Sequence, residues 1–169
     1  MKKERGFTLI ELMVALAVAA ILLTTGIPAM RDFIRDNRLT AATNTFVSTL
    51  NIARSEAITQ GRSASVCVSS NQTNCSGSNW QSGWIVWVDS DGDGGFDANE
   101  VLRVVEPLPA TVSATLSSGQ SSFSVDAQGA VSNPNFTLTL CDDRSGETGR
   151  QLRIMATGGV SLNSQFGCS

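Results

Sequence analysis

The sequence predicts an α+β protein in which one long N-terminal helix, with a membrane half and an amphipathic half, packs on a small antiparallel β-sheet domain. An apolar run fills residues 7–30, and Glu11 is its only charged residue. A helical apolar periodicity continues to about residue 60, and short β-rich segments separated by Gly, Ser and Asn fill the rest of the chain. These three observations carry the fold prediction.

Residues 7–30 are long enough to span a bilayer as a helix. Lys2, Lys3 and Arg5 precede them and favour a cytoplasmic N-terminus, which places the rest of the chain on the outer side. Two alternatives stay open, an uncleaved anchor and a secretory signal peptide cut after residues 17–19. The second places the cut in the middle of the apolar run.

The second half of the helix is predicted over residues 31–61. Pro28 lacks an N–H group and predicts a kink between the two halves. Apolar residues then recur at steps of three and four and define one stripe along the helix. The stripe consists of Leu39, Ala42, Phe46, Leu50, Ala53 and Ala57. Gly61 predicts the end of the helix, and the stripe requires a surface to pack on.

Residues 62–169 predict one β-rich domain whose strands form an antiparallel sheet. The strands are expected at residues 65–69, 83–88, 101–105, 112–116, 122–125, 136–141, 151–155 and 160–162. Trp80, Trp84 and Trp87 could line a ligand groove or fill the core of the sheet. Their alternation along a strand favours the core.

The four cysteines, Cys67, Cys75, Cys141 and Cys168, all follow the membrane segment. An even number of cysteines in an exported domain predicts disulfides, and four cysteines allow three pairings. Local closure favours Cys67 with Cys75 and Cys141 with Cys168. Zinc binding is the alternative, but the spacings match no zinc finger or ribbon.

The composition argues against several classes of function. The net charge is −3, and no lysine follows Lys3, so the clustered cations of a general nucleic-acid binder are missing. The chain has no histidine, and no nucleophile elbow, phosphate loop or catalytic cysteine motif is present. No enzyme activity is predicted.

Glu11 is the candidate functional residue of the apolar segment, because carboxylates inside a bilayer are costly and usually functional. Cleavage after Gly6 would leave the α-amino group of Phe7 one helical turn from Glu11. That amine could pair with this carboxylate or with that of a neighbouring chain. The alternative is that Glu11 reaches the cytoplasmic interface and has no role.

The hexapeptide from Gly6 to Glu11, GFTLIE, resembles the processing site of type IV pilins and type II secretion pseudopilins. In that family a prepilin peptidase cuts after the glycine and N-methylates the phenylalanine. The resemblance implies a cleaved leader at residues 1–6 and a methylated Phe7. It also implies that Glu11 pairs with the amine of an adjacent subunit and aligns the subunits of a filament.

Later segments narrow the resemblance to the H-type pseudopilin and FimT/FimU minor-pilin family. They read NRLTAA at residues 37–42, ARSEA at 53–57, GWIVWVD at 83–89 and LCDDR at 140–144, with a near-terminal Cys168. The resemblance implies the pilin-like fold and a structural minor pilin of the type IV pilus, which copolymerises with other pilins to start or cap a filament. It would sit in the bacterial inner membrane with its C-terminal domain in the periplasm.

Two alternative functions remain within this resemblance. One is an H-type pseudopilin that acts in protein secretion, and the other is a DNA-binding minor pilin for natural transformation. Arg144, Arg150 and Arg153 are the candidate DNA-binding residues. Some FimT-like proteins carry a Gly-Arg-x-Arg motif implicated in DNA uptake, whereas residues 158–161 here read GGVS, which puts nucleic acid in doubt as a partner.

Residues 89–100 fit the twelve-residue calcium loop position by position. Acids stand at positions 1, 3, 5, 9 and 12, and a glycine stands at position 6. The acids are Asp89, Asp91, Asp93, Asp97 and Glu100, and the glycine is Gly94. Strand-like segments flank the loop in place of helices, so the alternative is an acidic hairpin turn. Calcium is the one cofactor that the sequence suggests, and the filament function requires none.

Overall fold

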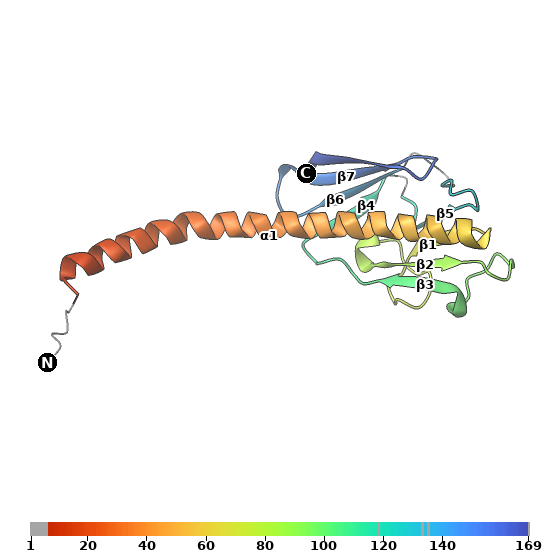
Figure 1. Cartoon of the computed structure of the whole chain (residues 1–169), viewed down its shortest axis with the longest axis horizontal. Helices are drawn as coiled ribbons and strands as arrows, with labels where there is room; N and C mark the ends of the chain where they lie inside the picture. Colours follow the sequence, from red (N-terminus) through yellow and green to blue (C-terminus); the bar gives the residue numbers. More distant parts are fainter. Residues whose placement is uncertain (1–6, 118, 133, 135, 169) are drawn as a thin grey trace. The chain divides into compact units, whose positions relative to one another are not determined.

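The computed structural model describes residues 7–117, 119–132, 134 and 136–168 (Figure 1). The predicted leader, with Gly6, lies outside these residues. Helix α1 spans Leu9–Gln60, and two 3-10 helices, η1 and η2, span Trp80–Ser82 and Ala98–Glu100. The strands are β1 (Ala64–Val68), β2 (Trp84–Val88), β3 (Val101–Val105), β4 (Ser113–Leu116), β5 (Ser122–Val125), β6 (Thr137–Cys141), β7 (Gly146–Ile154) and β8 (Val160–Cys168).

The chain divides into two compact units, Met1–Asn37 and Arg38–Ser169. The described part of the first unit is helical from Leu9 onward, and the helix passes Pro28 without interruption. Its large apolar side chains are all exposed, from 43% at Ile34 to 84% at Phe7. The first unit therefore has no core of its own.

In the second unit, one stripe of α1 is buried. The six apolar residues predicted for this stripe are each at most 4% exposed: Leu39, Ala42, Phe46, Leu50, Ala53 and Ala57. The predicted stripe is confirmed. Thr43 and Thr49 are buried as well, because their hydroxyls donate to helix carbonyls four residues earlier, at 2.8 and 2.9 Å.

Gly61 ends α1 as the sequence predicts. It has a φ of +65°, a left-handed conformation that glycine adopts without steric cost. The N–H of Gly61 donates to the carbonyl of Ile58 at 3.4 Å, and that of Arg62 to the carbonyl of Ala57 at 3.1 Å. This pair of bonds is a Schellman motif, which satisfies the last carbonyls of the helix.

The strands form two antiparallel sheets rather than the one that the sequence predicts. One sheet has the order β3-β2-β1-β5 and the other the order β4-β6-β7-β8. The prediction of a single sheet is wrong because β5 returns to pair with β1, opposite Ala64–Cys67, while β4 pairs with β6. Such long-range pairing leaves no local signal in the sequence. All eight predicted strands are present, and the α+β, pilin-like fold class is confirmed.

Both sheets and α1 contribute to one hydrophobic core. The ring of Phe46 lies about 6 Å from the rings of Trp80, Trp84 and Phe123. The indole N–H of Trp84 donates to the hydroxyl of Thr49 at 3.0 Å and so links the sheet β3-β2-β1-β5 to the helix. Trp80 and Trp84 are thus core residues.

Strands β7 and β8 are longer than the sequence predicts. They form a hairpin in which Ile154 is opposite Val160 and Gly146 is opposite Cys168, with two register shifts in β7. The added residues are mainly Gly, Ser, Thr, Asn and Gln, which do not alternate between apolar and polar. The hairpin extends because one strand pairs with the other, and no apolar pattern marks its end.

Candidate functional site

The start of α1 carries the predicted assembly residue. Thr8 precedes the helix, and both its hydroxyl and its carbonyl accept from the N–H of Glu11, at 3.3 and 3.2 Å. Thr8 is therefore the N-cap, and Glu11 stands at the third helical position, in the sequence spacing of a Thr-x-x-Glu capping box. The role of Thr8 was not predicted from the sequence, and its spacing of three residues from Glu11 is the signal that could have revealed it.

Phe7 and Glu11 are both exposed in the described structure. Glu11 stands in the first turn, where the positive end of the helix dipole favours a carboxylate. Phe7, the predicted methylation site, directly follows the predicted cleavage site Gly6, which is outside the described residues. The geometry leaves the carboxylate of Glu11 and the start of the helix open to another molecule.

The rest of the first unit is an uncovered apolar helix. An 18-residue window of α1 is apolar enough to cross a membrane, and none of that window is buried. Its exposed large side chains are Phe7, Leu9, Ile10, Leu12, Met13, Val14, Leu16, Val18, Ile21, Leu22, Leu23, Ile27, Met30, Phe33 and Ile34. An apolar surface of this size requires lipid or other protein chains around it.

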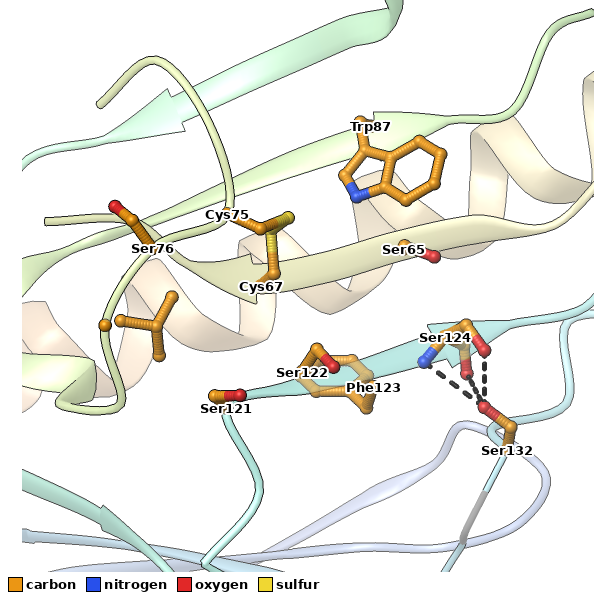
Figure 2. Close-up of a pocket in the computed structure, with 12 residues that line it drawn as sticks. Ser65, Cys67, Cys75, Ser76, Trp87, Ser121, Ser122, Phe123, Ser124 and Ser132 are labelled. Atoms are coloured by element: carbon orange, nitrogen blue, oxygen red, sulfur yellow. Dashed lines mark hydrogen bonds between the residues drawn. A yellow bond between two sulfur atoms is a disulfide. The ribbon is translucent and has the colours of Figure 1, made fainter. Parts of the chain in front are cut away.

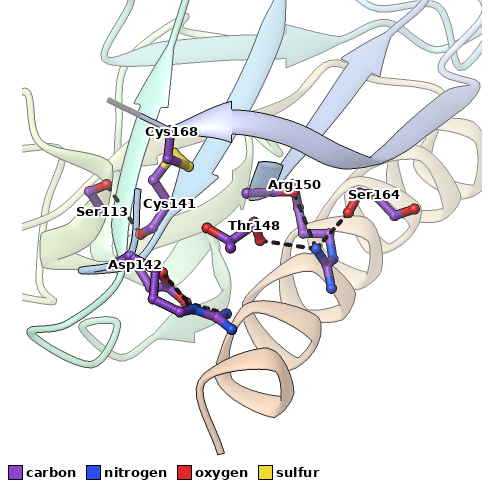
Figure 3. The surroundings of a disulfide bond; sticks show 9 residues. Ser113, Cys141, Asp142, Thr148, Arg150, Ser164 and Cys168 are labelled. Atoms are coloured by element: carbon purple, nitrogen blue, oxygen red, sulfur yellow. Dashed lines mark hydrogen bonds and ion pairs between the residues drawn. A yellow bond between two sulfur atoms is a disulfide. The ribbon is translucent and has the colours of Figure 1, made fainter. Parts of the chain in front are cut away.

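Two disulfides close loops in the second unit. The structure pairs Cys67 with Cys75 and Cys141 with Cys168, the local pairing that the sequence favours. The second bridge joins the ends of β6 and β8 (Figure 3). Gly149 lies directly under it, since a Cβ there would come within 2.4 Å of the sulfur of Cys168. The polar hairpin β7–β8 is thereby tied to the body of the sheet.

The acidic loop connects β2 to β3 through η2. The carboxylates of Asp89, Asp91 and Asp93 each have an oxygen within 4.8 Å of the others. The carboxylate of Asp93 accepts from the N–H of Gly95 at 2.6 Å. The structure thus brings three of the five predicted ligands together and fixes at least one of them through the backbone.

Asp97 and Glu100 complete the acidic loop, and their pKa values move in opposite directions. Desolvation raises the pKa of Asp97, and the negative charges of Asp93, Asp91 and Glu100 raise it further. Desolvation also acts to raise the pKa of Glu100. The hydrogen bonds from Ser90 and from nearby backbone N–H groups outweigh it and lower that pKa overall. The structure therefore favours an ionised Glu100.

The three candidate DNA-binding arginines do not form one cationic surface. The guanidinium of Arg144 makes an ion pair with Asp142 at 2.6 Å. That of Arg150 donates to the carbonyl of Ser164 at 2.6 Å (Figure 3). Arg150 and Arg153 are three residues apart on β7 and point to opposite faces of the sheet. Arg150 and Arg153 therefore do not share one face of the sheet.

The turn that stands in the place of the family's Gly-Arg-x-Arg motif is packed against Arg54. This side chain donates to the carbonyls of Gly129 and Gly158, at 3.2 and 3.3 Å. A Cβ at Gly158 would lie 2.5 Å from the Nε of Arg54. Gly158 has a φ of +74°, which favours glycine, and the hydrogen bonds of Arg54 hold the turn against the helix.

Trp87, the third tryptophan, lines a surface pocket of about 350 Å³ beside the Cys67–Cys75 disulfide (Figure 2). Most of the other lining residues are serines, among them Ser65 and Ser122. The indole N–H of Trp87 is buried and has no hydrogen-bond partner among the described residues. The groove interpretation is therefore still open for Trp87, and the core residue Trp80 also lines a smaller pocket of about 200 Å³.

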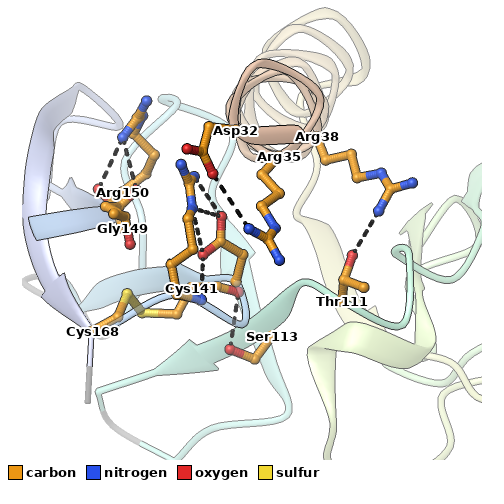
Figure 4. A network of polar contacts seen from close by, with 12 residues as sticks. Asp32, Arg35, Arg38, Thr111, Ser113, Cys141, Gly149, Arg150 and Cys168 are labelled. Carbon is orange, nitrogen blue, oxygen red and sulfur yellow. Dashed lines mark hydrogen bonds and ion pairs between the residues drawn. A yellow bond between two sulfur atoms is a disulfide. The ribbon is translucent and has the colours of Figure 1, made fainter. Parts of the chain in front are cut away.

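Figure 4 shows a contact that ties the start of the second unit to its sheets. Arg38, the first residue of this unit, donates to the hydroxyl of Thr111 at 3.2 Å. Close by, the hydroxyl of Ser113 on β4 donates to the carbonyl of Cys141 on β6 at 3.3 Å. These contacts are structural.

Comparison with known families gives two matches along the chain. Residues 42–158 match the family described as type II transport protein GspH, and residues 1–27 match the prokaryotic N-terminal methylation motif. Together the two matches leave out residues 28–41, and they cover most of the apolar segment, the later part of the amphipathic half and all strands but β8.

Individual relatives fall into the same class. Prepilin peptidase-dependent protein D of Escherichia coli (strain K12) is 53% identical over 47 residues, which are 28% of this chain and 32% of that protein. A fimbrial protein of Pseudomonas aeruginosa is 40% identical over 62 residues, 37% of this chain and 40% of that protein. The chain thus spans only about a third to two fifths of the curated relatives it matches.

Solved structures share the fold over most of the chain. The type IV minor pilin FimU of Pseudomonas aeruginosa has a TM-score of 0.64 at 26% identity and covers 80% of this chain and 96% of its own. The minor pseudopilin EpsH from the type 2 secretion system of Vibrio cholerae has a TM-score of 0.54 at 14% identity, over 75% of this chain and 97% of its own. At that identity the second likeness concerns the fold alone.

Proposed function

The chain belongs to the GspH family of type II transport proteins, and on that premise we propose that it is a structural minor pilin, cut after Gly6 and copolymerised with other pilins. One observation carries the proposal. The first unit exposes a membrane-length apolar helix whose only charge between residues 7 and 30 is Glu11. Lipid covers this surface before assembly, and the helices of other subunits cover it in the filament.

The leader determines the orientation of the chain in the membrane. Its lysines and arginine hold the N-terminus in the cytoplasm, so that the second unit faces the periplasm. Two disulfides in that unit fit an oxidising compartment. The chain is thus anchored in the inner membrane until a prepilin peptidase frees the amine of Phe7.

Glu11 then selects the position of the subunit in the filament. A carboxylate in lipid is costly unless a cation neutralises it, and a methylated α-amine of a neighbouring subunit supplies that cation. The hydrogen bonds of Thr8 fix the first turn and leave the Glu11 carboxylate exposed for this contact. Pairing of the two charges sets a defined axial offset between neighbours.

Glu11 variants test this role against the capping role. Glu11→Ala removes both, whereas Glu11→Gln keeps a side chain that a capping box accepts and removes the charge. Both variants should insert and be cut after Gly6, yet incorporate poorly into sheared filaments, as measured by immunoblot of filament and membrane fractions. Normal incorporation of Glu11→Gln would contradict the pairing role.

Substitution of Gly6 should affect cleavage of the leader, which precedes incorporation into filaments. A larger residue at the cut should leave an unprocessed precursor in the membrane, visible as a heavier band, and mass spectrometry of the wild-type chain should find N-methylated Phe7. A mature wild-type chain that begins at residue 20 would contradict the proposal, since it would identify residues 1–19 as a secretory signal peptide.

The type IV pilus is the machine we favour over the type II secretion system. The support is the likeness to FimU, which has both the higher identity and the higher TM-score. Deletion of the gene should reduce surface pili and leave the secretion of exoproteins unchanged. The reverse result would assign the chain to a secretion pseudopilus.

A further inference from the structure

The loop between β2 and β3 has a chemistry that filament assembly does not use. The carboxylate oxygens of Asp89, Asp91 and Asp93 lie within 4.8 Å of one another. Calcium binds oxygen at 2.3–2.6 Å, so two ligands on opposite sides of one ion are about 5 Å apart. The three oxygens therefore have the spacing of ligands that share one calcium ion.

Backbone N–H groups hold all three carboxylates in place, that of Asp93 through the bond from Gly95 described above. Asp89 accepts from the N–H groups of Gly92 and Gly94, at 2.7 and 3.1 Å, and Asp91 accepts from that of Asp93 at 3.1 Å. Ordered ligands lower the entropic cost of binding, because less motion is lost when the ion arrives.

Glu100, the last residue of the loop, supplies an independent observation. It is 5% exposed, and its Oε1 accepts from the N–H and the hydroxyl of Ser90 at 2.6 and 2.9 Å. Its Oε2 is buried and has no hydrogen-bond partner among the described residues. Because Ser90 lies between Asp89 and Asp91, these bonds hold the Glu100 carboxylate against the segment that carries the other acids. A buried carboxylate oxygen without a partner, held beside this segment, is a group that a bound cation would neutralise.

No side chain supplies that cation. The nearby Arg62 donates from Nη1 to the backbone carbonyl of Asp89 at 3.4 Å. Across the part of the chain that the structure describes, no ion pair joins an arginine to any acid of residues 89–100. The negative charge of the loop is thus left for an ion from solution.

We propose that this loop binds one Ca²⁺ through the carboxylates of Asp89, Asp91, Asp93 and Glu100, and that the ion fixes the connection between β2 and β3. Magnesium is a poorer fit, since it requires near-ideal octahedral geometry and keeps several of its waters. No long helices brace the loop, so we expect a dissociation constant of about 10⁻⁴–10⁻³ M, as in extracellular calcium modules.

The full chain in detergent micelles, first treated with chelator, provides the test. Titration calorimetry with CaCl₂ should give a dissociation constant in that range, and calcium at ten times this value should raise the melting temperature by about 3–6 °C. MgCl₂ should bind at least about tenfold more weakly. The absence of both binding heat and a melting shift up to about 10 mM calcium would overturn the proposal. Equal binding of the two metals would overturn it as well.

Substitutions then locate the site. Asp91→Asn and Glu100→Gln should each weaken calcium binding by about tenfold or more, because each removes one ligand charge. Asp126→Asn is the matched control, since the Asp126 carboxylate also accepts backbone N–H bonds in an exposed turn, at 2.9 and 2.8 Å, outside the loop. Unchanged affinity of Asp91→Asn, or an equal loss in the control, would contradict the assignment. Asp91 is exposed, so its variant decides the matter even if Glu100→Gln fails to fold.

Discussion

The two halves of α1 have the same backbone structure and opposite side-chain environments. Phe33 in the first unit is 62% exposed, whereas Phe46 in the second unit is fully buried among aromatic rings. The stability of the second half comes from tertiary burial, as in most helices of globular proteins. The first half buries nothing within its own unit, and under the proposed function the membrane and the filament supply its surroundings. Substitutions in the first half should therefore affect assembly, and those in the second half should affect folding.

The largest contrast should come from the two phenylalanines. Phe46→Ala should destabilise the second unit by about 3–5 kcal/mol, because it leaves a cavity between α1 and the sheets. Phe33→Ala should change the unfolding free energy by less than about 0.5 kcal/mol, as an exposed position does. Denaturant titration of the full chain in detergent, followed by tryptophan fluorescence, measures both. Similar losses in the two variants would show that the halves do not differ in this way.

Loss of a disulfide should have the second-largest effect on stability. Both disulfides lie in the second unit and stabilise only that unit. Loss of the Cys141–Cys168 bridge should cost about 3.5 kcal/mol and loss of the Cys67–Cys75 bridge about 2.5 kcal/mol, from separations of 27 and 8 residues on a chain-entropy account. Paired Cys→Ser variants and thermal melting provide the values. Peptide mapping without reduction should recover these two pairs, and crossed pairs or free thiols would refute the assignment.

A third effect concerns a buried hydrogen bond that the sequence does not reveal. Thr49→Val removes the acceptor of the Trp84 indole N–H and should cost about 1–3 kcal/mol, since the N–H stays buried without a partner. Thr40→Val, at an exposed position of the same helix, is the control and should change stability by less than about 0.5 kcal/mol. Equal effects would mean that loss of the hydroxyl, rather than of this bond, determines the cost.

The elements with a strong local pattern could be predicted from the sequence. The apolar stripe from Leu39 to Ala57, the stop at Gly61 and the presence of all eight strands follow from periodicity and turn residues. The burial of Thr43 and Thr49 could not be predicted, because polar side chains are usually exposed. Here their hydrogen bonds make burial favourable. The split into two sheets depends on which strand pairs with which, and such pairing is not local.

The candidate sites also divide into those with a local sequence pattern and those that depend on tertiary structure. GFTLIE at residues 6–11 and the acid pattern of residues 89–100 are contiguous motifs, so sequence alone could identify them. The separation of Arg150 from Arg153 onto opposite faces, and the bond from Arg54 to the turn at Gly158, depend on strand parity and tertiary contact. Proximity in sequence places Arg144, Arg150 and Arg153 in one cluster, and strand parity assigns Arg150 and Arg153 to different faces of β7.

The smallest expected effect lies at the start of α1, and it separates the capping of the first unit from its assembly role. Thr8→Ala removes the hydroxyl that accepts from the Glu11 N–H and should cost about 1 kcal/mol of local helix stability, without change in the unfolding of the second unit. Hydrogen exchange of the Glu11 amide in micelles should accelerate about fivefold, which corresponds to that free energy. Thr24→Ala, whose hydroxyl donates to the Ile21 carbonyl within the same unit, should leave that amide unchanged. If Thr8→Ala also left Glu11 exchange unchanged, Thr8 would have no capping role, and the order of the first turn would have to come from the lipid or the neighbouring subunits around it.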